Sequence, residues 1–519
     1  MTDPDLPNFS ASQAPAEKPN TRTVVFATVR MAAVAVVSGV AAAVMATGLA
    51  GCADMSGIQS TAHRRDTASL GFKFGGPGTP TIQAEWWREF GDASLNQLIA
   101  QALQDSPNLK LAQARLARVQ AVTEVAGAAT RPQINGQLDI TRQQYTANGA
   151  VPPPLAGTVR NSGVAQLSGS WELDFFGKNR AALDAALGTA NAAEADVQAA
   201  RVMLASNVAR TYFQILRLNE QSLLARRTLA QRTGILMLVQ ARVQAGLDTK
   251  LELNQSEGSL PDARLQLEAL QEQLALTQNA LAVLVGQPNR TLVVNMPALT
   301  AIKNVANTAS AGAVIPADLL GRRADIEAAR WRVEAAGKDV VNAKTQFYPN
   351  INLVAFAGFS SIGLGRLLDA GSQQAGIGPA LRLPIFDAGR LRANLRGKSA
   401  DLDAAVETYN ATVIDAVRDV ADQITLIQAI ARQQTEQRAT QASSKAAYDI
   451  AVQRYRAGLS NFVNVLTAES QVLIQQRSMI DLAARALDTQ VALIRALGGG
   501  YQPEGNAGRL SSISTQLNK

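Results

Sequence analysis

The chain is divided near its C-terminus by the stretch Arg454-Tyr455-Arg456-Ala457-Gly458-Leu459-Ser460-Asn461-Phe462. Residues 400–457 before Gly458, and residues 462–497 after it, contain no glycine or proline, so each segment is predicted to form one uninterrupted helix. Glycine readily adopts the positive φ that is needed just after a helix C-terminus. The stretch therefore predicts the tight turn of a very long helical hairpin.

A second copy of this turn occurs earlier as Arg242-Val243-Gln244-Ala245-Gly246-Leu247-Asp248-Thr249, 212 residues before its counterpart. Its recurrence predicts a tandem repeat. Long helices are expected at 178–244, 249–285, 389–456 and 460–497. The first helix of each hairpin, with roughly 65 residues, would be about 100 Å long. Pro261 predicts a kink or a local break in the second segment.

Each repeat also contains a pair of segments in which polar and apolar residues alternate. They predict strands at 133–144, 163–175, 350–360 and 375–386. At about 10–13 residues, such strands are slightly longer than a tilted crossing of a bilayer requires. A helix with a coiled-coil seam precedes each pair, from Leu109 to Ala126 and, 217 residues later, from Ile326 to Ala343. The alternation favours an outer-membrane barrel, and a soluble sheet lying on helices is the alternative.

Composition argues against several classes of function. The 49 Lys and Arg residues exceed the 42 Asp and Glu residues by 7, but the excess is spread along the chain. A nucleic-acid surface would concentrate it. One cysteine and one histidine nearly exclude His-based catalysis, Cys/His metal sites and disulfides. No nucleotide-binding GxxxxGK[ST] motif is present. Glu257 and Glu469 occupy matching positions in the two repeats, and we expect structural roles for both, so an enzyme is not expected.

The N-terminus carries the features of an export signal. Residues 1–30 are polar and contain three basic residues, residues 31–47 are apolar, and Leu49-Ala50-Gly51 precedes Cys52. A transmembrane helix is the alternative, but the apolar run is short for spanning a bilayer. The sequence Leu-Ala-Gly-Cys resembles the bacterial lipobox, which implies cleavage after residue 51 and acylation of Cys52. Acylation would anchor the chain to lipid, and Ala53 after the cysteine implies sorting to the outer membrane.

The expected organisation is a lipoprotein signal peptide (1–51), an acylated linker (52–83), two repeats (84–300 and 301–500) and a flexible tail (501–519). The fold class is mainly α with a small membrane β part. Four strands per chain cannot close a barrel, and open strand edges are not tolerated in lipid. Two chains would supply 8 strands and three chains 12, and more than 8 strands leave a lumen. Long helices that continue the wall of such a barrel would form a conduit.

Three motifs connect this organisation to a known family: residues 85–92 (EWWREFGD), 171–177 (WELDFFG) and 319–326 (LLGRRADI). Together with the tandem repeat, they resemble the outer-membrane efflux protein family of TolC-like channels, and within it the NodT-type outer-membrane lipoproteins of RND efflux systems. Ala324 stands where the family usually has proline.

The resemblance implies a homotrimer with a 12-stranded barrel in outer-membrane lipid and an α-helical coiled-coil tunnel in the periplasm. It implies two partners, a periplasmic adaptor (membrane fusion) protein and an inner-membrane RND transporter. The channel would conduct small molecules passively to the exterior, without a cofactor. A TolC-like channel for type I protein secretion and a non-channel scaffold of coiled coils are the alternatives.

The resemblance also places the periplasmic entrance of the tunnel at the two helical tips. In some members, aspartates just after the second tip help to close the tunnel, and here Asn464 and Thr467 stand in their place. The candidate entrance residues are Arg242, Gly246, Asp248, Lys250, Glu252, Arg454, Arg456, Gly458, Asn461 and Asn464. We hypothesise that Arg242, Arg454 or Arg456 pairs with Asp248 or Glu252 and holds the entrance shut. The alternative is that these are solvated charges, worth less than about 1 kcal/mol each.

Overall fold

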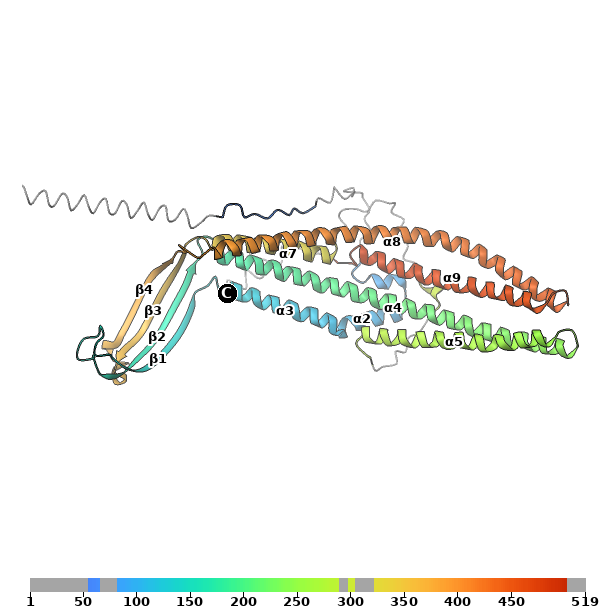
Figure 1. Cartoon of the computed structure of the whole chain (residues 1–519), viewed down its shortest axis with the longest axis horizontal. Helices are drawn as coiled ribbons and strands as arrows, with labels where there is room; N and C mark the ends of the chain where they lie inside the picture. The colour runs from blue at the N-terminus through green and yellow to red at the C-terminus, as the bar shows by residue number, and fades with distance from the viewer. Residues whose placement is uncertain (1–54, 66–81, 289–296, 304–321, 502–519) are drawn as a thin grey trace, which may run out of the picture.

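The computed structural model describes residues 55–65, 82–288, 297–303 and 322–501. The predicted signal peptide (1–51), Cys52 and nearly all of the predicted C-terminal tail (501–519) lie outside these residues. The chain is elongated, with a sheet at one end and two helical tips at the other (Figure 1). The prediction of a mainly α fold with a small β part is confirmed. No helix among the described residues is both long enough and apolar enough to cross a membrane.

Seven α-helices lie within the described ranges, and six of them correspond in order to the predicted helices. In the first repeat they are α2 (Ala93–Asp105), α3 (Pro107–Ala128), α4 (Lys178–Gln244) and α5 (Lys250–Leu284). In the second repeat they are α7 (Ala324–Thr345), α8 (Arg390–Arg456) and α9 (Phe462–Ala496). The two longest, α4 and α8, contain 67 residues each, and both begin after a glycine with positive φ, Gly177 and Gly389.

The two hairpin turns have the same backbone geometry. Gly246 and Gly458 have φ of 70° and 72°, the left-handed conformation predicted from the sequence. After each glycine, the backbone N–H of the next residue returns to the last turn of the helix: Leu247 donates to the Arg242 carbonyl and Leu459 to the Arg454 carbonyl, both at 2.9 Å. These bonds use carbonyl groups that the helix itself leaves unpaired, so each long helix ends sharply and its partner returns alongside.

The break predicted at Pro261 does not occur, because α5 runs through this residue from Lys250 to Leu284. A proline removes one helical hydrogen bond, and here other contacts hold the helix together. The Ser259 carbonyl, two residues before the proline, accepts a hydrogen bond from Arg232 Nη1 at 2.8 Å. α5 also packs along α4 over its length. The helix therefore continues through the proline where it is packed on α4 and bonded by Arg232.

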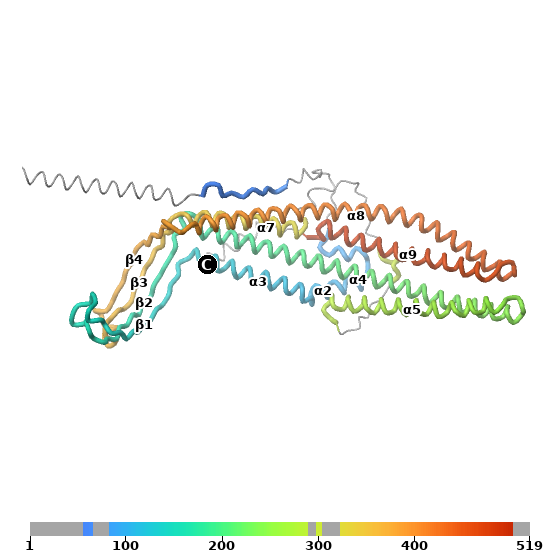
Figure 2. The backbone as a smooth tube through the Cα atoms, in the orientation of Figure 1, coloured from blue at the N-terminus to red at the C-terminus, as the bar shows by residue number. Residues whose placement is uncertain are grey.

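The sheet has four antiparallel strands in the order β1-β2-β3-β4 (Figure 2). They are β1 (Gln133–Gln144), β2 (Val159–Leu173), β3 (Asn350–Ile362) and β4 (Gln373–Arg382). β2 starts before the expected residue 163, and β4 ends before the expected residue 386. Leu138 lies opposite Ala165, which lies opposite Phe359, so the apolar residues of neighbouring strands share one face. Ile134, Leu138 and Ile377 on that face are 76%, 67% and 76% exposed.

The largest core lies about midway along the long helices, far from both ends of the molecule. Trp86, Trp87 and Phe90, from the motif at 85–92, are at most 4% exposed and pack against α4. Asp92 caps α2 by accepting bonds from the backbone N–H groups of Ser94 and Leu95. It also accepts a hydrogen bond from Tyr212 of α4 at 2.5 Å. This motif therefore fixes α2 against the long helices and has a structural role.

Candidate functional site at the helical tips

The tips of the two hairpins lie side by side at the end of the molecule opposite the sheet (Figures 1 and 2). A small apolar core joins them: Val239 of α4, Tyr455 of α8, and Phe462 and Val465 of α9 are each at most 2% exposed. The Tyr455 and Phe462 rings lie 5.6 Å apart. The tips are thus packed against each other and do not end in two separate loops.

A bidentate ion pair closes the first tip. Arg242 Nε lies 2.9 Å from Asp248 Oδ2, and Arg242 Nη2 lies 3.2 Å from Asp248 Oδ1. The two side chains are 13% and 9% exposed, so water screens this pair less than a surface ion pair. The Tyr455 hydroxyl of the second hairpin donates a hydrogen bond to Asp248 Oδ2. The Arg242 guanidinium also lies over the Tyr455 ring, 4.6 Å from its centroid.

The charge of Asp248 follows from these contacts. Burial alone would raise the pKa of its carboxyl group, but the hydrogen bonds from Arg242 and Tyr455 and the positive charge of Arg242 outweigh it, so the pKa is lowered. Burial and the bond to Asp248 raise the pKa of the Tyr455 hydroxyl, which remains a donor at neutral pH. The ionised Asp248 carboxylate thus accepts hydrogen bonds from one donor in each hairpin, Arg242 and Tyr455.

The other predicted entrance residues have different roles. Glu252 accepts the backbone N–H of Thr249 at 2.9 Å and forms a capping box at the start of α5. Asn461 caps α9 by accepting the backbone N–H of Asn464 at 3.3 Å. Lys250 is the exposed first residue of α5. Among the described residues, Arg454 and Arg456 form no ion pair with an acidic side chain.

Sequence reasoning missed Tyr455 as a member of this site. The residue stands in the turn between two basic residues, Arg454 and Arg456, whose charges are the more obvious candidates for an entrance site. The available signal was an aromatic side chain three residues before the turn glycine, since the hairpin turn brings that position close to Phe462. Only the packing of one hairpin on the other, which links residues 207 positions apart, shows that Tyr455 reaches Asp248.

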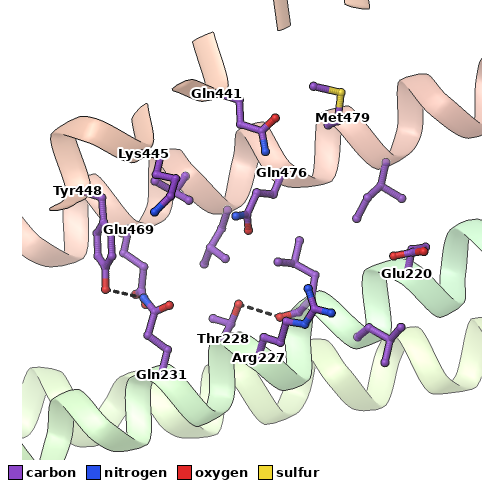
Figure 3. Close-up of a pocket in the computed structure, with 15 residues that line it drawn as sticks. Glu220, Arg227, Thr228, Gln231, Gln441, Lys445, Tyr448, Glu469, Gln476 and Met479 are labelled. Carbon is purple, nitrogen blue, oxygen red and sulfur yellow. Dashed lines mark hydrogen bonds between the residues drawn. The ribbon is translucent and has the colours of Figure 1, made fainter. Parts of the chain in front are cut away.

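A second polar cluster connects the hairpins further from the tips (Figure 3). Glu469 of α9 is 2% exposed and accepts hydrogen bonds from Gln231 Nε2 at 3.1 Å and from Arg232 Nε at 3.2 Å, both on α4. Gln231 Nε2 also donates to the Tyr448 hydroxyl of α8 at 2.5 Å. Arg232 reaches Asp262 of α5 at 3.2 Å. Side chains from all four long helices therefore meet at this level.

Glu469 is an ionisable group in an environment that resists its charge. Burial raises the pKa of its carboxyl group, and the charge of Arg232 and the bonds from Arg232 and Gln231 offset only part of that effect. A cavity of ≈ 400 Å³ lies beside it, between the two hairpins, and Lys445, Gln476 and Arg227 line it. The structural role that the sequence suggested for Glu469 is thus a link between hairpins.

Comparison with known proteins gives a match in each of the two repeats. The model of the family described as "Outer membrane efflux protein" matches residues 98–287 and 315–499. The chain is 30% identical over 469 residues to the multidrug resistance outer membrane protein MdtQ of Escherichia coli O157:H7, a match that covers 88% of this chain and 96% of that protein. It is 33% identical over 422 residues to the pyoverdine export outer membrane protein OpmQ of Pseudomonas putida, covering 81% and 88%.

Solved structures show the same architecture. The outer membrane protein VceC of Vibrio cholerae matches with a TM-score of 0.76 and 36% identity, covering 81% of this chain and 100% of that chain. The outer-membrane channel OprN matches with a TM-score of 0.74 and 26% identity, covering 85% and 98%. The expected resemblance is thereby confirmed in sequence and in fold, over both repeats. The chain belongs to the outer membrane efflux protein family.

Proposed function

We propose that this protein is the outer-membrane exit channel of a tripartite efflux pump and conducts small molecules passively from the periplasm to the exterior. The observation that carries the proposal is the separation of two surfaces at opposite ends of one elongated chain. An apolar-faced sheet lies at one end, and two packed helical tips lie at the other, joined by helices of 67 residues. At 1.5 Å per residue these helices extend about 100 Å, enough to carry a tunnel well away from a membrane.

The sheet requires further chains to become a channel. Its edge strands β1 and β4 have no second neighbouring strand among the residues that the structure describes. Three copies would supply 12 strands, which leave an open lumen, whereas two copies would supply 8 and fill the interior with side chains. We therefore propose a homotrimer in outer-membrane lipid, whose periplasmic end works with an adaptor protein and an RND transporter. The proposed acylation of Cys52 would add a lipid anchor.

The tips support an assignment of the entrance. Asp248 accepts bonds from Arg242 of its own hairpin and from Tyr455 of the other, so separation of the two hairpins must break at least one of them. We propose that this group of three residues, the tip latch, holds the entrance closed. Of the pairings that the sequence suggested, the geometry favours Arg242 with Asp248, because Glu252 caps α5 and neither Arg454 nor Arg456 reaches a carboxylate within the described chain.

Two measurements test the function. The purified protein should have the mass of a trimer and should conduct ions in planar lipid bilayers. A non-channel scaffold would show no conductance. Deletion of its gene should raise the susceptibility of cells to small toxic molecules and leave the set of secreted proteins unchanged. If deletion instead removes secreted proteins and leaves susceptibility unchanged, the protein serves type I secretion and the efflux proposal is wrong.

A further inference from the structure

The loop between β3 and β4 folds back onto the apolar face of the sheet. A Cβ added to Gly163 of β2 would lie 3.0 Å from Leu367 Cδ2 and 3.1 Å from Leu364 Cδ2, so both leucines lie over this glycine, which is buried. Successive side chains of a strand point to opposite faces, so a Gly163 side chain would point to the same face as Ala165, the apolar one. The loop therefore covers this face at the end of the sheet opposite the helices (Figure 1).

Backbone geometry fixes the fold of this loop. Gly363 has a φ of 105°, a conformation that favours glycine and that turns the chain at the end of β3. Its N–H donates to the Asn161 carbonyl of β2 at 2.7 Å. The Leu367 N–H donates to the Leu364 carbonyl at 3.2 Å, and Ser372 Oγ donates to the Arg366 carbonyl at 2.7 Å. The loop leucines thus belong to an ordered turn.

The leucines of this turn are only partly used by their contact with Gly163. Leu364 is 40% exposed, and Leu368, which follows the turn, is 76% exposed. Ile140 of β1 lies directly opposite Gly163 in the sheet, and it is 62% exposed. Large apolar side chains therefore gather at one rim of the apolar face. An exposed apolar patch of this kind marks a surface that contacts lipid or another molecule.

Two arginines accompany these apolar side chains. Arg142 of β1 is two residues beyond Ile140 and shares its face, and Arg366 lies in the loop turn. Both are exposed. Within the described part of the chain, neither forms an ion pair with an acidic side chain, and this includes Asp369, whose backbone N–H donates to the Arg366 carbonyl. The rim thus combines apolar side chains with two positive charges that the described residues do not neutralise.

We infer that this rim patch, formed by Ile140, Arg142, Leu364, Arg366 and Leu368, binds a phosphate-bearing lipid of the outer leaflet. The acyl chains would lie against the apolar side chains, and the guanidinium groups would donate hydrogen bonds to the phosphate, for which their planar fork is suited. The patch continues the apolar face, and its charge is complementary to an anionic headgroup. This inference rests on the proposed outer-membrane channel and adds a lipid partner to it.

The opposite face of the sheet supplies a matched control. Arg160 of β2 is exposed and lies at the same end of the sheet. It is five residues from Ala165, an odd number, so its side chain lies on the polar face. A lipid that contacts the rim patch would therefore not reach this arginine. Replacement of Arg160 changes the net charge as much as replacement of either rim arginine.

Quenching of a tryptophan by brominated lipid tests the contact. The full-length variant L368W places the reporter at the most exposed of the three apolar positions. It is reconstituted in bilayers of phosphatidylcholine mixed with phosphatidylglycerol, with bromine on the acyl chains of one lipid or the other. The fluorescence of the four native tryptophans is subtracted. We expect phosphatidylglycerol to be preferred over phosphatidylcholine at this position by about fivefold or more, the contribution of a single basic residue near an anionic lipid surface.

The charge variants are made in the same reporter protein. R142Q/R366Q should lose the preference while both lipids still quench, because the apolar contact remains. R160Q should keep the preference. The conductance of each variant and of the native protein is measured in parallel, and I140W replaces L368W as the reporter if L368W does not conduct.

A preference that R142Q/R366Q removes and R160Q retains supports the inference. Equal quenching by the two lipids, or a preference that R142Q/R366Q leaves unchanged, overturns the phosphate contact in a channel whose conductance is intact. If neither lipid quenches the reporter of a conducting channel, something other than lipid covers the rim patch, and the inference is also overturned. A native protein that does not conduct contradicts the proposed channel itself.

Discussion

The Tyr455 hydroxyl of the second hairpin donates a hydrogen bond to Asp248 in the turn of the first, so a single carboxylate connects the two tips of the chain. Asp248 is 9% exposed and is already paired with Arg242, which keeps it ionised. A hydrogen bond to a charged group contributes about 1.5–3 kcal/mol, more than one between neutral groups. This contact is therefore strong enough to influence whether the tips stay together.

Replacing Tyr455 by phenylalanine keeps the packing against Phe462 and removes only the hydroxyl. The proposed tip latch then loses its connection between hairpins, and the population of the open entrance should rise about tenfold or more, since each 1.4 kcal/mol is a factor of ten. Single-channel recording in planar bilayers measures the open fraction. K250Q, which changes an exposed charge at the same tip, is the matched control. Equal open fractions in Y455F and the native protein would mean that the bond does not hold the entrance closed.

Acid should weaken the tip latch. The pKa of Asp248 is lowered in the folded protein, so its ionised form stabilises the closed tips at any pH above its ordinary value of about 4. That stabilisation is lost as the pH falls through the lowered pKa. The open fraction should therefore be constant from pH 7 to pH 5 and rise below pH 4. The D248N channel should be open more often than the native channel at neutral pH, and its open fraction should not rise in acid. If the open fraction of D248N rises in acid as much as that of the native protein, groups other than Asp248 cause the rise.

Removing Arg232 should destabilise the connection between hairpins around Glu469. The R232A variant leaves a carboxylate that is 2% exposed without its positive partner, which typically costs roughly 3–5 kcal/mol. The double variant R232M/E469L replaces both charges by apolar side chains and should recover most of the loss. Thermal unfolding of the purified protein measures the effect, with R226A, an exposed arginine of α4, as the control. A double variant no more stable than R232A would contradict the buried-charge explanation.

Glu469 should respond to pH with the sign opposite to that of Asp248. Its pKa is raised by burial, so the folded state binds the proton more tightly than the unfolded state. The resulting stabilisation is complete below the ordinary pKa and is lost as the pH rises through the raised value. From pH 4 to pH 8, the unfolding temperature of the native protein should therefore fall relative to that of E469Q. A difference that is constant with pH would show that Glu469 does not titrate in this range.

Helix α3 provides a test of the proposed homotrimer that does not involve the strands. Leu111 is 50% exposed, but its counterpart Ala328 in α7 is fully buried. L111D should reduce the fraction of trimer at a given protein concentration, because the charge would enter an apolar position that the second repeat buries. A117D is the control, since its counterpart Glu334 is itself partly exposed and charged. Size-exclusion chromatography with light scattering gives the mass, and equal trimer fractions would place Leu111 outside the interface.

Much of the fold was predictable because its strongest signals are local or periodic. Gly246 and Gly458 identify the turns, and the 212-residue spacing between them identifies the repeat. The alternation of polar and apolar residues predicted four strands and indicated which face of the sheet is apolar. The ends of β2 and β4 were less predictable, since the residues there also suit a loop. The local break predicted at Pro261 does not occur, because α5 also packs along α4 and receives a hydrogen bond from Arg232, contacts that the local sequence does not reveal.

The site was only partly predictable for a related reason. Sequence indicates which charges stand at the tips but not which of them meet. Asp248 and Arg242 lie six residues apart around a turn, and their pairing could be anticipated. The participation of Tyr455 depends on how one hairpin packs against the other, as does the meeting of Gln231, Tyr448 and Glu469. No short-range pattern encodes such contacts.

The equal lengths of the hairpins impose a limit on how this protein can evolve. α4 and α8 both have 67 residues, and α5 and α9 both have 35. One inserted residue would advance a tip by 1.5 Å and rotate every later side chain by about 100°. Tyr455 would then no longer face Asp248, and the two tips would end at different heights. Viable changes in length must therefore occur in both arms of a hairpin and in both repeats, and steps of seven residues, which nearly restore the facing side chains, disturb the packing least.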